Sequence, residues 1–310
     1  MPHVAILVHR DDDFEGTGYF LAAFAALWRA QGIRVAVLRG AGEHLPADLA
    51  FLHVDLTVVP RPYRALAARY PRVVNGAVAD ISKRRVSAHI CRRGDGWDGP
   101  VIVKTNRNYG GNKEAEKARR RGGWAGGLLA WRDRLPWYWR GRLDLGEYRV
   151  LERAADLPLA CWLNPSLVVE RFLPERDGEF YCLRTWVFLG DRETNSLSWS
   201  RHPVVKSQNV VRREPVADVP AELREARRRL GFDFGKFDYA VVDGRAVLYD
   251  ANRTPALGSF TPEQLMPRVR HLAAGIDSLL AAPESARPVS TAGGILPITT
   301  HGPTAPDRRG

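Results

Sequence analysis

The spacing of apolar residues in the first part of the chain alternates between strand-length runs and one helical repeat. "HVAILVH" and "IRVAVLRG" are short apolar runs, and "FLAAFAALWRA" between them repeats its large apolar side chains at helical spacing. This order predicts a β-α-β unit over residues 3–40. "LAFLHVDLTVVP" and "RVVNGAVAD" add further short strands. The pattern therefore predicts an N-terminal α/β domain with a parallel sheet over residues 1–85.

Beyond residue 85 the pattern changes several times. The strand "PVIVKT" and a basic stretch interleaved with tryptophan and tyrosine predict a second domain over residues 86–165. Three β-rich segments, the helix "PAELREARRRLG", a hairpin and a last amphipathic helix predict a third domain over residues 166–282. Residues 283–310 are rich in Pro, Gly, Ala and Thr without periodicity, which predicts a disordered tail.

Composition narrows the class of protein. Of the 310 residues, 45% are hydrophobic and 26% are charged, which is typical of a globular chain. No apolar run approaches the roughly 18 residues of a membrane span, so we expect no membrane association. Cys91, Cys161 and Cys182 are an odd and widely spaced set, which argues against a disulfide framework or a zinc site. Since the start also has no signal-peptide pattern, the cytoplasm is the expected location.

The formal net charge of +11 leaves two interpretations open. Phosphate ligands, acidic substrates and nucleic acids all suit a basic chain. An arginine-rich surface without any anionic partner suits it equally well. Charge alone therefore assigns no function.

The segment "KFDYAVVDGRAVLYDANRTP" carries the most specific chemistry in the chain. Two apolar runs flank Asp243-Gly244, which predicts an antiparallel hairpin. Asp238 and Asp250 lie at comparable distances from the turn, so we expect them opposite each other, with Asn252 facing the same side. Two carboxylates and an amide oxygen on one face suit Mg²⁺ completed by nucleotide phosphates. Ordinary exposed acids at strand ends are the alternative interpretation.

This hairpin resembles the metal-binding strands of the ATP-grasp family. Ligases of that family carry an Asp on one strand and the pattern E-x-N-x-x-P on the next, matched here by Asp238, Asp250, Asn252 and Pro255. Asp250 stands where Glu is more usual, which shortens the side chain but keeps its charge. The resemblance implies an α/β chain of the ATP-grasp fold, in which a parallel-sheet domain precedes two α+β subdomains that clasp ATP. It implies ATP and Mg²⁺ as cofactors, with Mn²⁺ as a substitute.

Two further segments resemble the phosphate-binding parts of the family. "VIVKTNRNYGG" matches a strand lysine followed by a glycine-rich loop, which implies that Lys104 lies near the α- and β-phosphates. Gly110 and Gly111 would let the loop backbone approach the phosphates, because glycine has no Cβ. "NGAVADISKRR" resembles the segment with the first nucleotide lysine, here Lys83, although Ser82 replaces the usual Asp before it.

The segment "LVVERFLPERDGEFYCLRTWVF" resembles the hinge strand that receives adenine. The resemblance implies that Glu170, Arg171 and Phe172 offer backbone groups to the base. It also implies that Glu179 holds the ribose hydroxyls.

The resemblance implies catalytic residues on the strands that follow the hinge. Arg184 matches an arginine that faces the reacting phosphoryl group in the glutamate-ligase-like branch, and a surface strand arginine is the alternative. "SRHPVVKSQN" occupies the place of the substrate-side strand and loop, which makes Arg201, Lys206 and Asn209 candidates.

The resemblance implies an ATP-dependent carboxylate–amine ligase of the glutamate-ligase-like branch. The substrate carboxylate would take the γ-phosphoryl group to form an acyl phosphate, and an amine would displace phosphate to form an amide. Small-molecule or peptide carboxylates and amines are the expected substrates, and a homodimer is compatible with the sequence. The alternatives are a phosphotransferase on the same fold, and a nucleotide-binding or nucleic-acid-binding regulatory protein.

Two other segments have both a functional and a structural interpretation. Residues 113–149 lie where the family has a lid, and arginines surround the aromatic side chains of Trp124, Trp131, Trp137, Tyr138 and Trp139. We expect these to pack in the lid core, and binding of an acidic peptide or RNA carrier is the less favoured alternative. The acids of "RDDDFEGTGY", Asp11 to Asp13, follow the first strand. They suit contact with an amine-bearing substrate or, equally, a helix N-terminus.

Overall fold

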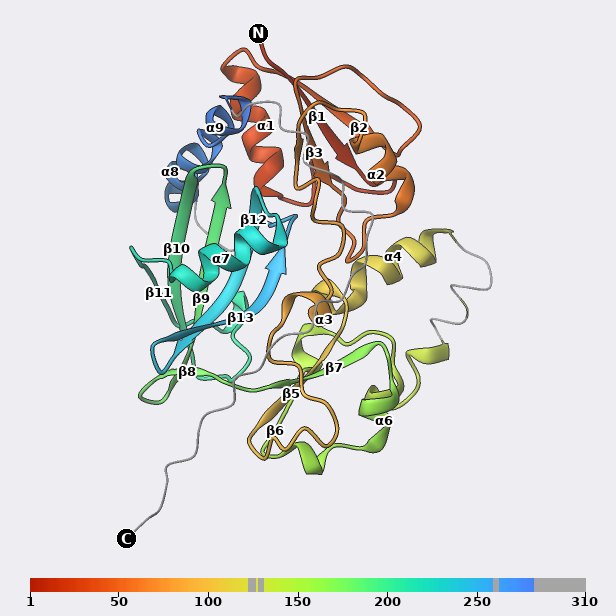
Figure 1. Ribbon diagram of the computed structural model, residues 1–310, viewed down its shortest axis with the longest axis vertical. Coiled ribbons are helices and arrows are strands. Elements are labelled where there is room, and N and C mark those ends of the chain that lie inside the picture. The colour runs from red at the N-terminus through yellow and green to blue at the C-terminus, as the bar shows by residue number, and fades with distance from the viewer. Residues whose placement is uncertain (122–126, 128–130, 259–261, 282–310) are drawn as a thin grey trace, which may run out of the picture.

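Three sheets organise the chain: one parallel sheet, one small antiparallel sheet and one larger antiparallel sheet (Figure 1). The computed structural model describes residues 1–121, 127, 131–258 and 262–281. Trp124 and the tail predicted over residues 283–310 lie outside this description. The predicted fold class, an α/β protein with an N-terminal parallel sheet followed by two α+β parts, is confirmed.

The parallel sheet is N-terminal and has the strand order β2-β1-β3-β4. Its elements are β1 (His3–Val8), α1 (Phe20–Ala30), β2 (Arg34–Arg39), β3 (Leu49–His53), α2 (Arg61–Ala67) and β4 (Val73–Val74). Val4 to Val8 are fully buried because α1 packs on one face of the sheet and α2 on the other. The carboxyl ends of β1 and β3 are neighbours, since Val8 pairs with His53.

The small antiparallel sheet has the order β6-β5-β7. The elements of this part are α3 (Lys83–Val86), β5 (Val101–Thr105), α4 (Asn112–Arg121), β6 (Arg149–Leu151), α6 (Leu159–Leu163) and β7 (Leu167–Arg171). Its core includes Val101, Val103 and Val169. Because β7 pairs with β5, the sheet extends to Arg171, beyond the domain boundary expected at residue 165.

The larger sheet has the order β11-β10-β9-β12-β13, and β8 pairs with β9. Its elements are β8 (Glu175–Asp177), β9 (Phe180–Leu189), β10 (Arg192–Ser200), β11 (Arg212–Pro215), α7 (Ala221–Leu230), β12 (Phe234–Val242) and β13 (Arg245–Asn252), followed by α8 (Pro262–Ala273) and α9 (Ile276–Ala281). α8 packs on the larger sheet, where Arg268 donates a 2.9 Å hydrogen bond to Thr194, and both last helices share a core with α1 and the parallel sheet. Within that core, the Trp28 indole donates a 2.9 Å hydrogen bond to the Ala273 carbonyl.

The predicted hairpin of β12 and β13 is confirmed. Asp243 and Gly244 have φ values of 51° and 75°, the left-handed conformation that a tight hairpin turn requires. Asp238 pairs directly with Asp250, as expected, whereas the next pair joins Tyr239 to Leu248. One extra residue, Tyr249, therefore forms a bulge beside Asp250.

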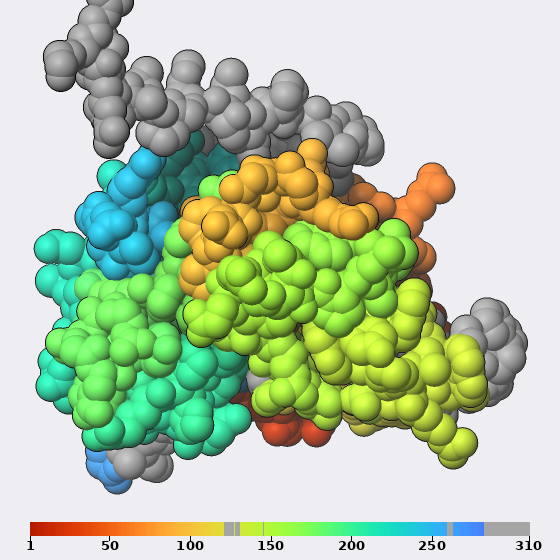
Figure 2. Space-filling view, turned by 90° about the horizontal axis from the view of Figure 1, so that it is seen from below, coloured from red at the N-terminus to blue at the C-terminus, as the bar shows by residue number. Residues whose placement is uncertain are grey.

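The three sheets meet around a central region. Figure 1 shows the parallel sheet at the top, the larger sheet on the left and the small sheet at the lower right, with α3 and α4 between the first and the last. Figure 2 shows from below that the small-sheet part (orange to yellow-green) lies directly beside the larger sheet (green to blue). Contacts from Lys83 to Asp250 and from Thr254 to Asp55 join the parts.

The expected tryptophan core of residues 113–149 is correct only in part. Trp137 and Tyr138 pack against the core of the small sheet. Trp131 and Trp139, by contrast, are 58% and 44% exposed, so the expectation is wrong for these two. Aromatic residues in a basic stretch do not reveal from the sequence whether another element covers them.

Two tryptophan variants test this packing. Trp137→Ala is expected to lower the free energy of unfolding by about 1–3 kcal/mol, because a half-buried ring loses apolar contacts. Trp131→Ala removes an exposed ring from the same segment and should change it by less than about 0.5 kcal/mol. Urea unfolding measures both, and equal losses would contradict the packing described.

Within the described residues, no helix is both long enough and apolar enough to cross a lipid bilayer. Cys91, Cys161 and Cys182 are buried free thiols. The cytoplasmic location and the homodimer stay predictions.

Candidate active site

The hairpin acids each contact a lysine. The Lys236 ammonium group lies 2.8 Å from one oxygen of Asp238, whose other oxygen accepts a 3.0 Å hydrogen bond from Thr185. Lys83, at the start of α3, forms an ion pair with Asp250. Burial raises the pKa of Asp250, but Lys83 outweighs it with help from Lys236, so that pKa lies below its ordinary value. Asp250 is therefore a carboxylate at neutral pH.

A third ion pair lies on the small sheet. Lys104 on β5 lies 2.7 Å from Glu170 on β7, and both side chains are at most 10% exposed. The other Glu170 oxygen is buried without a hydrogen-bond partner among the described residues. The Lys104 ammonium also lies 5.4 Å from the ring centre of Tyr249, which the bulge directs toward it. Glu170 thus fixes Lys104 at the edge of the hairpin.

Lys206 adds a further positive charge near the hairpin acids. Burial lowers its pKa to about 8, although Asp238 and Asp250 act in the opposite direction. Its ammonium group lies 5.3 Å from the ring centre of Tyr148. Burial also raises the pKa of the Tyr148 hydroxyl to about 12, so this ring stays neutral. We call Lys83, Lys104, Lys206 and Lys236 the lysine cluster.

The glycine-rich loop is shaped by a close backbone contact. Gly110 and Gly111 have φ values of 67° and 81°, which other residues rarely adopt. A Cβ on Gly110 would lie 2.1 Å from the Leu143 carbonyl oxygen. The Leu143 amide in turn donates a 3.2 Å hydrogen bond to the Gly110 carbonyl. Gly110 is therefore required by the fold here, whatever its role toward phosphates.

The predicted adenine hinge has two of its amides engaged within the chain. The Arg171 amide donates to the His89 carbonyl at 2.8 Å, and the Phe172 amide donates to the Pro100 carbonyl at 2.9 Å. The Leu173 carbonyl accepts a 2.6 Å hydrogen bond from the Tyr249 hydroxyl. These contacts tie the hinge to the small sheet and to the hairpin.

Arg184 lies apart from the lysine cluster. Thr185 pairs with Asp238 and shares its face of the larger sheet, so its neighbour Arg184 points to the opposite face. The Arg184 guanidinium there contacts Glu175 at 2.7 Å. The structure therefore does not bring Arg184 to the hairpin acids.

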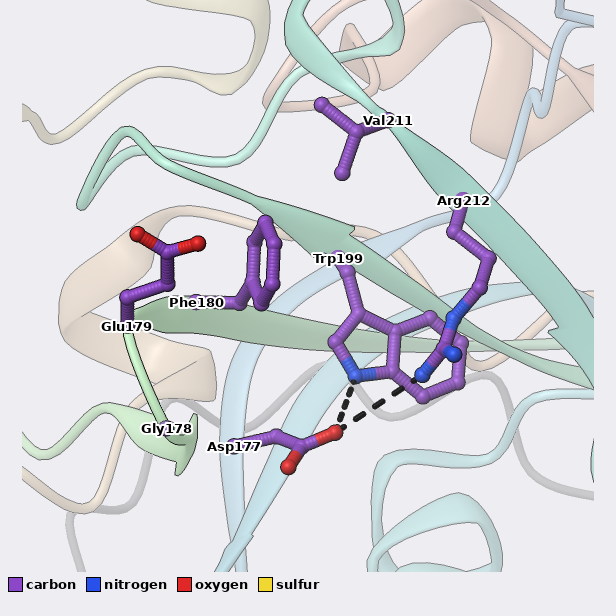
Figure 3. Close-up of a pocket in the computed structure, with 7 residues that line it drawn as sticks. All are labelled: Asp177, Gly178, Glu179, Phe180, Trp199, Val211 and Arg212. Carbon is purple, nitrogen blue, oxygen red and sulfur yellow. Dashed lines mark hydrogen bonds and ion pairs between the residues drawn. The ribbon is translucent and has the colours of Figure 1, made fainter.

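Arg201 and Glu179 also lie outside the cluster. They form an exposed ion pair of 2.6 Å with each other. Glu179 lines a pocket of about 410 Å³, in which the Phe180 and Trp199 rings form the walls (Figure 3). Asp177 at its base accepts a 2.8 Å hydrogen bond from the Trp199 indole. Of the three predicted catalytic residues, only Lys206 thus lies beside the hairpin acids.

The hairpin offers suitable donors for a magnesium ion. Asp238 and Asp250 are directly paired, and the Asn252 amide oxygen already accepts a 2.9 Å hydrogen bond from the Thr254 amide. Within the described ranges no three His, Cys, Asp or Glu side chains gather as a metal site. Two carboxylates are nevertheless the protein ligands that Mg²⁺ commonly takes when phosphates complete its shell. The residues therefore fit a nucleotide-bound Mg²⁺.

Four residues of the site were missed from the sequence, and only one of them left a signal that could have revealed it. Lys236 lies two positions before Asp238, and strand alternation alone is enough to place both on one face. Thr185 and Tyr148 carry no such signal, because each meets the site only through tertiary packing. Tyr249 could not be predicted, because in a regular hairpin without the bulge its side chain would not point toward Lys104.

Comparisons with known proteins give structural likeness without a sequence match. No protein-family model and no curated protein matches the chain. The chain is similar over 90% of its length to the RimK domain ATP-grasp protein of Sphaerobacter thermophilus, which is covered to 99% at 16% identity with a TM-score of 0.46. It is similar over 90% of its length to D-alanine–D-alanine ligase of Bacillus anthracis, covered to 96% at 11% identity with a TM-score of 0.48. The same ligase complexed with ATP gives 90% and 96% coverage, 12% identity and a TM-score of 0.45.

Proposed function

We propose that this chain is an ATP-grasp ligase of the glutamate-ligase-like branch, which joins a carboxylate to an amine and converts ATP to ADP and phosphate. The observation that carries the proposal is the convergence of the lysine cluster on the strand-paired Asp238 and Asp250. A triphosphate has the negative charge that such a cluster attracts, and charge-assisted hydrogen bonds would hold it strongly.

Asp238, Asp250 and Asn252 would hold Mg²⁺ together with phosphate oxygens, and Mn²⁺ would substitute for it. The bound ion would neutralise charge on the γ-phosphoryl group during transfer. Lys104, fixed by Glu170, would bind phosphate oxygens. The backbone of Gly110 and Gly111 and the hinge at Arg171 and Phe172 remain proposed nucleotide contacts.

The proposed reaction has two steps. An oxygen of the substrate carboxylate first attacks the γ-phosphorus, the bond to the β–γ bridging oxygen breaks, and ADP leaves. The amine nitrogen then attacks the acyl carbon, the carbon–oxygen bond to phosphate breaks, and the nitrogen loses a proton. Arg184 lies on the opposite face of the larger sheet from Asp238 and takes no part in these steps. Arg201 and Glu179 would contact a substrate once the exposed ion pair between them opens.

The depressed pKa of Lys206 predicts how ATP affinity depends on pH. The ammonium group is charged below about pH 8 and neutral above it. Bound phosphate favours the charged form, so ATP affinity should be highest below this pH and should fall about tenfold as the pH rises through and beyond 8. Titration calorimetry across pH 6.5–10 measures the profile. Lys206→Met should flatten it, and an unchanged slope in that variant would assign the titration to another group.

A product search tests the proposed function. The protein, ATP and Mg²⁺ are incubated with pools of carboxylates and amines, and products are identified by mass spectrometry. We expect ADP formation that requires both a carboxylate and an amine. Heavy oxygen in the substrate carboxylate should appear in the released phosphate, because the acyl phosphate breaks at its carbon–oxygen bond. A stable phosphorylated product that forms without an amine would instead identify a phosphotransferase.

A further inference from the structure

Two buried acids of the parallel-sheet domain lie close together at the strand ends. Asp12 follows β1 and Asp55 follows β3, whose carboxyl ends are neighbours. The Tyr19 hydroxyl donates a 2.7 Å hydrogen bond to Asp55 and lies 3.3 Å from an oxygen of Asp12, so it stands between the two carboxylates. The side chains of Asp12 and Asp55 are only 2% and 10% exposed. We call Asp12 and Asp55 the N-terminal acid pair.

Two ammonium groups cover the N-terminal acid pair. Lys113 lies 3.2 Å from Asp55, and Lys117 lies 3.8 Å from Asp12. Both lysines lie on one face of α4, one turn apart, and α4 begins directly after the glycine-rich loop. The cations therefore come from an element outside the domain that holds the acids. The longer contact shows that Lys117 does not fill its side of the pair with an ideal hydrogen bond.

A buried histidine beside the pair has unused polar atoms. His53 is 1% exposed, and neither ring nitrogen has a hydrogen-bond partner among the described residues. Its ring meets the Tyr19 and Phe14 rings edge-on at 4.7 and 5.4 Å. Burial lowers its pKa to about 3, so the ring is neutral and adds no positive charge. A buried ring with two unused nitrogens is costly unless a ligand or water meets them.

A hydrogen-bond chain joins the N-terminal acid pair to the proposed metal ligands. The Thr254 hydroxyl donates to Asp55 at 2.9 Å, and it also lies 3.2 Å from the Asn252 amide oxygen. A single residue, Thr254, therefore separates the pair from Asn252, one of the proposed metal ligands. A group bound there would stand beside the proposed metal site.

We propose that the N-terminal acid pair is the binding site for the ammonium group of the amine substrate, and that Lys113 and Lys117 occupy it with the same chemical group when that substrate is absent. The inference rests on the proposed function, because it gives the bound amine its place in the reaction. Two carboxylates define the charge of the ligand, and the Phe14, Tyr19 and His53 rings form a largely apolar wall for the carbon chain next to it. The Tyr19 ring already has the Lys113 ammonium 5.9 Å from its centre, a distance at which cations are attracted to aromatic faces.

Binding of butylammonium, a simple amine without a carboxylate, tests the proposal. Saturation-transfer NMR would measure its dissociation constant on the full chain with Mg²⁺ and a non-hydrolysable ATP analogue, with butanol as the neutral control. We expect millimolar binding to the wild type and at least about tenfold weaker binding to Asp55→Asn. Asp12→Asn gives a second variant if Asp55→Asn does not fold. Glu15→Gln, which changes an exposed acid of the same loop, is the matched control and should bind like the wild type.

Removal of Lys113 and Lys117, which compete with the ligand, is expected to strengthen butylammonium binding. Lys113→Gln with Lys117→Gln should bind butylammonium at least about tenfold more tightly than the wild type. Arg119→Gln with Arg120→Gln removes the same charge from exposed positions of α4 and should leave binding unchanged. Equal binding to the wild type and Asp55→Asn would overturn the proposal, since a purely structural ion pair would then explain the lysines. ATP binding measured in parallel keeps this outcome separate from failure of the proposed function.

Discussion

Asp238→Asn is expected to reduce ATP turnover at least about 100-fold while the protein stays folded. The change removes one charge from the proposed ion site at nearly constant volume, and an asparagine still accepts the hydrogen bond from Thr185. Phosphoryl transfer is accelerated chiefly by stabilisation of charge on the transferred group, so loss of that stabilisation should appear in kcat. Coupled ADP assay at saturating Mg²⁺ measures turnover, and circular dichroism checks the fold.

Asp243→Asn is the matched control for this variant. Asp243 lies exposed at the turn of the same hairpin, and asparagine tolerates its left-handed conformation. It should therefore retain wild-type turnover. Asp250→Asn is a less clean test because Lys83, whose side chain is 4% exposed, would lose its partner. Near-normal turnover in Asp238→Asn would refute the metal assignment.

Lys104→Met is expected to weaken ATP binding and to destabilise the protein for separate reasons. Loss of a charge-assisted phosphate contact should reduce affinity about 10–100-fold. Glu170 would also be left as an unpaired buried carboxylate, which typically costs about 3–5 kcal/mol. Calorimetry with ATP and urea unfolding measure the two effects.

A double variant separates the affinity effect from the stability effect. In Lys104→Met with Glu170→Met, an apolar pair replaces the ion pair, so most of the stability should return. ATP affinity should stay low, because the cation is still missing. If the double variant regained ATP affinity, the phosphate lysine would have to be sought elsewhere in the cluster.

The hairpin was predictable because its determinants are local. Asp243-Gly244 specifies a tight turn, and the turn fixes which residues of the two strands face each other. Asp238 and Asp250 could therefore be paired from sequence alone. The bulge at Tyr249 was not predictable, since one extra residue in a strand leaves no mark in the apolar pattern.

Which residues outside the hairpin reach the site depends on the register between strands that are far apart in the sequence. Whether Arg184 or Thr185 shares a face with Asp238 depends on the alignment of β9 with β12, and a slip of one residue would exchange them. Likewise, the contacts of Lys83 with Asp250 and of Lys113 with Asp55 join residues far apart in the chain. The sequence pattern indicated Lys83, Lys104 and Lys206 as candidates, but neither Lys113 and Lys236 nor the acids that these lysines meet.

The contact between Trp28 and Ala273 has a consequence for how the protein is made. The face of α1 that packs against α8 and α9 belongs to a domain whose strands are translated first, but its covering helices are translated last. While the ribosome adds the intervening residues, Phe20, Phe24 and Trp28 lack part of their final neighbours. The nascent chain should therefore need protection from aggregation until α9 has left the exit tunnel. Release of the C-terminal helices, rather than completion of the first sheet, should be the event that makes the N-terminal half resistant to proteolysis.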